Sequence, residues 1–212
     1  MRGIRQHVNP LGLKYSVPRA NPLSRPSHLP ADGPVEVELG CADAQFSFQL
    51  ARHAPATWVC GLEIREPWVK RNLARAARQS LTNLSFGYVN LNVDLDRVFP
   101  ENSVDRFHLL FPDPWFKDKH KKRRVVAPDL CQTIVRQLRA GGELHIASDI
   151  FEITLEAMAE LEGSLENEGL FTNLAGPWSF WRGNPFPVAS KREDTTLRRG
   201  QRVWRLRYRL SP

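Results

Sequence analysis

From residue 35 onward, short strand-like runs alternate with longer segments of helical periodicity. The strand-like runs are Val35–Leu39, Trp58–Glu63, Leu84–Val89, Asp105–Phe111 and Glu143–Ser148. The helical segments are Gln45–His53, Pro67–Gln79, Asp129–Arg139 (followed by Gly141-Gly142) and Ile153–Asn167. Strands that alternate with helices form βαβ units with right-handed crossovers, and such units build a mainly parallel sheet.

Two further strands are indicated near the end of the chain, Leu170–Leu174 and Val203–Leu210. Apolar and polar residues alternate strictly in the second, which favours a strand with one face in solvent. We therefore predict an α/β protein, a three-layer sandwich around a Rossmann-like, seven-stranded, mostly parallel sheet with an antiparallel C-terminal strand.

The first 34 residues have a different character, with six prolines, five basic residues and one acid. Neither a helix nor a central strand tolerates prolines at that density. We predict an extended N-terminal arm over residues 1–34 and one folded domain over 35–212, a length that suits a single core. Whether the arm touches a partner or is a tail without a role stays open.

The charge balance and the cysteines limit the class of partner and the compartment. The chain has 30 lysines and arginines against 23 acids, a net charge of +7. That excess points to an anionic partner, nucleic acid first, or to a basic surface without a role, and the charge alone leaves both open. Its three cysteines form no CxxC pair, and no apolar run or start segment suits a membrane span or a secretory signal. We expect a cytoplasmic protein without membrane association.

Polar residues follow each of the five predicted parallel strands, where ligands bind in open α/β sheets. They are Glu38 and Gly40, Glu63, Asn90, Asp113, and Asp149. Each alone has an ordinary structural explanation, as a turn glycine, a helix-start acid or a cap. Together they predict a nucleotide-like cofactor, with Glu63 placed to bind a ribose diol, and a second pocket beside it.

Asp113 stands between two prolines in the stretch FPDPWFKDKHKKRR. Residues before proline avoid the helical region, so Phe111 and Asp113 are both expected to be extended and the carboxylate to be held in a defined direction. Six cations follow, Lys117, Lys119, Lys121, Lys122, Arg123 and Arg124. They could position RNA phosphates while the acid accepts hydrogen bonds from a guanine edge. Trp115 is either a stacking surface or a core anchor.

This stretch resembles the FPDPW-x-K-x-x-H-x-K-R-R motif of the tRNA (guanine-N7-)-methyltransferase family. The resemblance extends over roughly residues 35–210 and includes VELGC, GLEI, GGELHIASD and NLAGPW, and Ser190–Glu193 is similar to the family's T-K-F-E. It implies methyl transfer from S-adenosylmethionine to N7 of a guanine in the tRNA variable loop, without a metal. tRNA would be the partner of a monomer or homodimer.

The resemblance also implies a role for each matching residue. Glu38 and Gly40 would shape the methionine side of the cofactor pocket, Glu63 would bind the ribose, and Asn90 would lie near the adenine. Asp113 would be catalytic and would also border the cofactor. The substrate contacts would be Lys117, Asp149 and a substrate-binding loop made of Ser190, Lys191, Arg192 and Glu193.

The chain departs from the family pattern in three places. Ala42 and Ala44 replace glycines of a G-x-G-x-G turn, Ile150 and Phe151 follow Asp149 where Trp and Glu are usual, and Arg192 replaces an aromatic. The alanines leave open a non-catalytic tRNA-binding relative with a degenerate donor pocket. A nicotinamide oxidoreductase would not explain the basic run.

Overall fold

The computed structural model describes residues 8–15, 20–114, 126–164 and 168–211. Its strands form one sheet in the order β3-β2-β1-β4-β5-β7-β6. They are β1 (Val35–Leu39), β2 (Trp58–Glu63), β3 (Leu84–Tyr88), β4 (Val104–Leu110), β5 (Leu138–Ser148), β6 (Phe171–Asn173) and β7 (Trp204–Leu210). β1 to β5 are parallel, and β7 runs antiparallel to β5 and β6. The predicted seven-stranded, mostly parallel sheet is confirmed.

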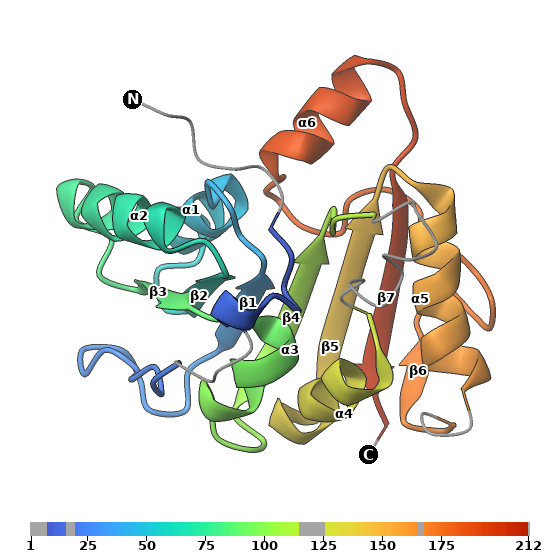
Figure 1. Cartoon of the computed structure of the whole chain (residues 1–212), viewed down its shortest axis with the longest axis horizontal. Coiled ribbons are helices and arrows are strands. Elements are labelled where there is room, and N and C mark those ends of the chain that lie inside the picture. Colours follow the sequence, from blue (N-terminus) through green and yellow to red (C-terminus); the bar gives the residue numbers. More distant parts are fainter. Residues whose placement is uncertain (1–7, 16–19, 115–125, 165–167, 212) are drawn as a thin grey trace.

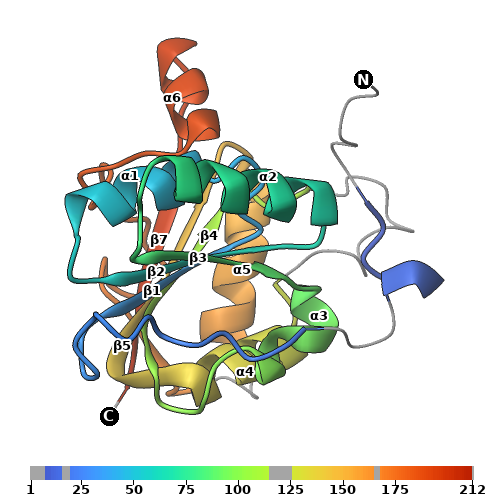
Figure 2. The same ribbon diagram turned by 90° about the vertical axis from the view of Figure 1, so that its left-hand side faces the viewer.

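Helices cover both faces of this sheet, which confirms the three-layer architecture. They are α1 (Gln45–His53), α2 (Glu66–Arg78), α3 (Leu91–Asp94), α4 (Pro128–Gln137), α5 (Phe151–Gly163) and α6 (Lys191–Arg198), with 3-10 turns η1 (Leu13–Tyr15) and η2 (Leu95–Arg97). α1 and α2 lie on one face, and α3, α4 and α5 lie on the other (Figures 1 and 2). α6 stands beyond the carboxyl ends of β4 and β5 (Figure 1).

The core is built from strands that are buried on both faces. All six residues of β2 are buried, as a parallel strand between two helical layers requires. Only glycine fits at position 61, because a Cβ atom there would lie 2.6 Å from the Phe86 ring. Glycine at position 61 therefore leaves room for the Phe86 ring of β3 and for the Cys41 thiol. None of the helices in the described ranges is both long and apolar enough to cross a membrane.

Three helix predictions were wrong at their ends. The helix expected over Pro67–Gln79 is shifted by one residue, to Glu66–Arg78. The helix expected over Asp129–Arg139 ends at Gln137, because Leu138 already pairs with Val104 of β4. The helix expected over Ile153–Asn167 begins at Phe151 and ends at Gly163, and residues 165–167 lie outside the described residues.

The expectation of a solvated face on the final strand is met only in part. β7 lies between β5 and β6, and the arginines on its polar side pair with acids. Arg205 is buried against Glu193, and Arg207 and Arg209 donate to Glu143 at 2.7 and 3.0 Å. The alternating pattern identified the strand correctly. On its polar side Arg205 is buried and Arg207 half-buried in ion pairs, while Arg209 is exposed as expected.

The described parts of residues 1–34 dock on the domain. Ala20 and Leu29 are buried in the core, and Leu23 N–H donates to Val98 O at 3.1 Å. The Asn90 side-chain amide donates to Pro10 O and Tyr15 O, each at 2.9 Å. These contacts give the arm a fixed path past the end of β3, while the domain division at residue 34 stays a prediction.

Candidate active site

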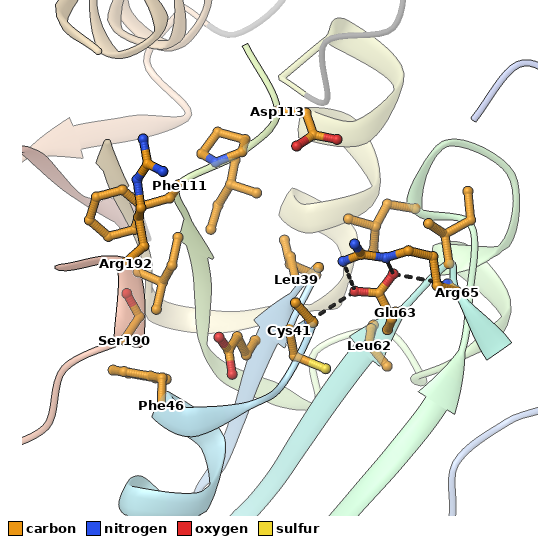
Figure 3. Close-up of a pocket in the computed structure, with 18 of the residues that line it drawn as sticks. Leu39, Cys41, Phe46, Leu62, Glu63, Arg65, Phe111, Asp113, Ser190 and Arg192 are labelled. Atoms are coloured by element: carbon orange, nitrogen blue, oxygen red, sulfur yellow. Dashed lines mark hydrogen bonds and ion pairs between the residues drawn. The ribbon is translucent and has the colours of Figure 1, made fainter. Parts of the chain in front are cut away.

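A cavity of about 540 Å³ opens beyond the carboxyl ends of the parallel strands. It is lined by every described candidate residue except Glu193: Glu38, Gly40, Glu63, Asn90, Asp113, Asp149, Ser190, Lys191 and Arg192. Ser190 and Arg192 lie across the cavity from Arg65 and Glu63 (Figure 3). Residues far apart in the sequence thus converge on one site. Trp115, Lys117 and the basic run up to Arg124 lie outside the described residues, so the expectations for them stay predictions.

The turn after β1 forms one wall of this cavity through its backbone. The N–H groups of Gly40 and Cys41 both donate to Leu62 O at 2.9 Å, and Gly40 has a φ of +77°. Ala42 and Ala44 also have left-handed backbones, with φ of +47° and +55°. That conformation strains a residue with a Cβ atom. The turn thus keeps a glycine-like path although two of its residues are alanines.

We expect Ala42→Gly to raise the free energy of unfolding by about 1 kcal/mol, because glycine adopts a positive φ without the Cβ penalty. Ala42 is the better site to change, since Ala44 is fully buried and its methyl contacts would be lost. Urea denaturation measures the change. Ala77→Gly on the exposed side of α2 is the matched control and should lower stability by about as much. A destabilised Ala42→Gly would contradict the strain argument.

Glu38 lies at the base of the cavity with only 5% of its surface exposed. It accepts a hydrogen bond from Ser47 N–H at 3.1 Å and another from the Ser47 hydroxyl. Burial raises the pKa of Glu38 to about 8, although the Ser47 hydrogen bonds lower it and the charges of Asp43 and Glu63 raise it further. A cationic ligand in the cavity would favour its ionised form.

Glu63 ends β2 and is held by two neighbours. Its carboxylate accepts from Ala42 N–H at 2.8 Å and Arg65 N–H at 2.9 Å, and the Arg65 guanidinium adds two bonds of 2.8 Å. Dashed lines mark these contacts in Figure 3. Burial would lower the pKa of Arg65, but the hydrogen bonds and charge of Glu63, with the charge of Asp113, raise it. The sequence argument missed Arg65, two residues after the expected ribose acid.

Asp113 lies in the loop after β4 and lines the cavity (Figure 3). The expectation that Phe111 is extended was wrong: its φ is +51°. Its N–H still donates to Ala147 O at 2.7 Å, so the chain leaves the sheet sharply at this residue. A left-handed residue before proline is strained, and such strain concentrates at functional sites.

Ser190–Glu193, expected to be a loop, begins helix α6 instead. The Ser190 hydroxyl caps the helix by accepting from Glu193 N–H at 3.2 Å. The S-x-x-E spacing is a capping-box signal that could have identified this helix from the sequence. Glu193 points away from the cavity and forms a buried ion pair with Arg205.

The start of α6 is tied to the cavity rim by side chains. Arg192 pairs with Asp149, with Nε–Oδ2 and Nη2–Oδ2 distances of 2.8 and 2.6 Å. Gln45 also donates to Asp194 at 2.9 Å. Two residues predicted to contact substrate, Asp149 and Arg192, thus contact each other. Within the described ranges, no cluster of His, Cys, Asp or Glu side chains could hold a metal ion.

Comparisons with known proteins agree with this architecture. A family model described as "Putative methyltransferase" matches residues 32–206. The tRNA (guanine-N(7)-)-methyltransferase of Synechococcus elongatus is 36% identical over 99% of this chain and 97% of its own length. That of Trichormus variabilis is 38% identical over 95% and 93%.

Solved structures of other methyltransferases share the fold. The 16S rRNA methyltransferase KamB matches 88% of this chain and 91% of its own with a TM-score of 0.60, at 16% sequence identity. The aminoglycoside resistance methyltransferase NpmB1 matches 84% and 87% with a TM-score of 0.55, at 17% identity. At such low identity, the likeness concerns the fold alone.

Proposed function

Because the chain belongs to the tRNA (guanine-N(7)-)-methyltransferase family, we propose that it transfers a methyl group from S-adenosylmethionine to N7 of a guanine in the tRNA variable loop. The observation that carries this proposal is the convergence of the described cofactor and substrate candidates, all but Glu193, on one cavity. Its volume lies in the usual range for cofactor sites.

The residues in the cavity fit S-adenosylmethionine, which supplies an electrophilic methyl group on a sulfonium. Glu38 and the turn at Gly40 would hold the methionine end, and Glu38 would be ionised beside a cation. Glu63 would bind the ribose hydroxyls, and Asn90 at the end of β3 would border the adenine. The cavity stays open although alanines stand at positions 42 and 44. The alternative of a non-catalytic relative is therefore not favoured.

Asp113 would hold the guanine in place and would not act as a base. Guanine N7 carries a lone pair and gains the methyl group without losing a proton. A carboxylate can instead accept from the N1–H and the exocyclic amine of the same base. The contribution of the chain is then positioning and electrostatics. Asp149, Lys191 and Arg192 at the rim would contact RNA around that base, and Lys117 with the following cations would contact phosphates.

The partner and compartment follow from the same proposal. We expect a monomer or homodimer that binds tRNA in the cytoplasm. Free, buried thiols at Cys41, Cys60 and Cys131 support a reducing compartment.

Incubation with unmodified tRNA and radiolabelled S-adenosylmethionine tests the activity. We expect label in the tRNA, together with strand scission at one variable-loop position under chemistry selective for 7-methylguanine. Fully modified tRNA is the matched control, because its N7 is already methylated. tRNA that binds but takes up no label would contradict the proposal and support the non-catalytic alternative.

A further inference from the structure

The carboxylate of Glu63 already has a full set of hydrogen-bond partners. One oxygen accepts from Arg65 N–H and Arg65 Nε, and the other accepts from Ala42 N–H and Arg65 Nη2. A carboxylate offers about four acceptor positions, two on each oxygen. All of them are therefore taken, three by Arg65.

Arg65 also covers Glu63 physically. The Glu63 side chain is 1% exposed and the Arg65 side chain 15% exposed, although both line the cavity. A ribose diol needs two acceptor positions on this acid. It can obtain them only where the guanidinium now donates, because the two backbone N–H groups belong to the fixed turn and strand end. The ribose diol and the Arg65 guanidinium thus compete for the same acceptor positions on the Glu63 carboxylate.

The cavity offers Arg65 a second acid. In Figure 3 the Asp113 carboxylate lies above the Arg65 guanidinium, and both residues line the cavity. Its charge interacts with that of Arg65. A guanidinium that leaves Glu63 would thus keep a carboxylate neighbour, on the side where the substrate base is expected.

We propose that Arg65 is a competitor of the cofactor ribose for Glu63, and that cofactor binding turns its guanidinium from Glu63 toward Asp113. This inference rests on the proposed function, because it needs a ligand with a ribose diol. Arg65 is then a positioning residue. It keeps Glu63 ordered in the free protein and weakens cofactor binding by the free energy of the ion pair that must be broken.

Isothermal titration with S-adenosylhomocysteine tests this. S-adenosylhomocysteine has a neutral thioether in place of the sulfonium. Removing the positive charge of Arg65 therefore does not tighten binding merely by relieving repulsion between two cations. We expect Arg65→Ala to bind it about 3- to 10-fold tighter than wild type, because the ligand no longer has to displace the guanidinium from Glu63. Arg65→Gln keeps most of the aliphatic part of the side chain but not its charge, and it should also bind S-adenosylhomocysteine more tightly than wild type. In a Glu63→Gln background, removal of Arg65 should no longer tighten binding.

Arg71→Ala is the matched control, because Arg71 lies on α2 over the Trp68 ring and does not line the cavity. It should leave the affinity unchanged, and thermal unfolding should show every variant folded. Equal or weaker binding by both Arg65 variants, with wild-type binding intact, would overturn the competition. Absence of binding by wild type and variants alike would overturn the proposed function, and the inference with it.

Discussion

Asp113→Ala is expected to lower the rate of tRNA methylation by roughly 10²- to 10³-fold, the usual effect of removing one preorganised contact in an active site. The physical reason is that Asp113 is held by Pro112 and Pro114 after the sharp turn at Phe111, so the carboxylate is oriented before the base arrives. Single-turnover measurement with saturating enzyme separates this loss from slow product release.

Two companion variants sharpen the test of Asp113. Asp113→Asn keeps the shape but replaces one acceptor oxygen with a donor, so it should lose most of the activity as well. Asp32→Ala removes an exposed acid that does not line the cavity and should be fully active. Calorimetry with S-adenosylhomocysteine should show wild-type affinity for Asp32→Ala. The two Asp113 variants should bind this ligand no more than about 3- to 10-fold more weakly, because Asp113 would receive the displaced Arg65 guanidinium. Wild-type rates in Asp113→Ala would rule out the assigned role.

The central part of the fold was predictable because its strands are short, apolar and separated by amphipathic helices. β1, α1 and β2 have the predicted bounds. The errors occur where tertiary contacts override local preference. Leu138 joins β5 through pairing with Val104, and Arg205 on the polar face of β7 is buried against Glu193 of α6. Neither contact has a signal within a short window of sequence.

In the candidate site, too, the positions of residues were predictable from the sequence, whereas their tertiary contacts were not. The rule that ligands bind beyond parallel strand ends identified Glu38, Glu63, Asn90, Asp113 and Asp149, and these line one cavity. It could not show which of them are paired with other side chains. Arg65 on Glu63 depends on side-chain directions that only the folded backbone determines.

Glu193→Ala is expected to lower the free energy of unfolding by about 3–5 kcal/mol, because it leaves the charge of Arg205 buried without its partner. The two side chains are 3% and 7% exposed and link α6 to β7. For a chain of this size the loss corresponds to roughly 6–20 °C in melting temperature. Thermal unfolding followed by circular dichroism measures it, and Glu156→Ala on the exposed side of α5 is the matched control.

A double variant then separates structure from substrate contact at Glu193. Glu193→Leu combined with Arg205→Met replaces the buried ion pair with apolar side chains, a change that is often neutral or stabilising. If Glu193 acts by holding the start of α6 at the cavity rim, the double variant should recover both stability and tRNA methylation. If Glu193 contacts the substrate directly, stability should return while activity stays low. A single Glu193→Ala variant that melts with the wild type would contradict the buried-pair argument itself.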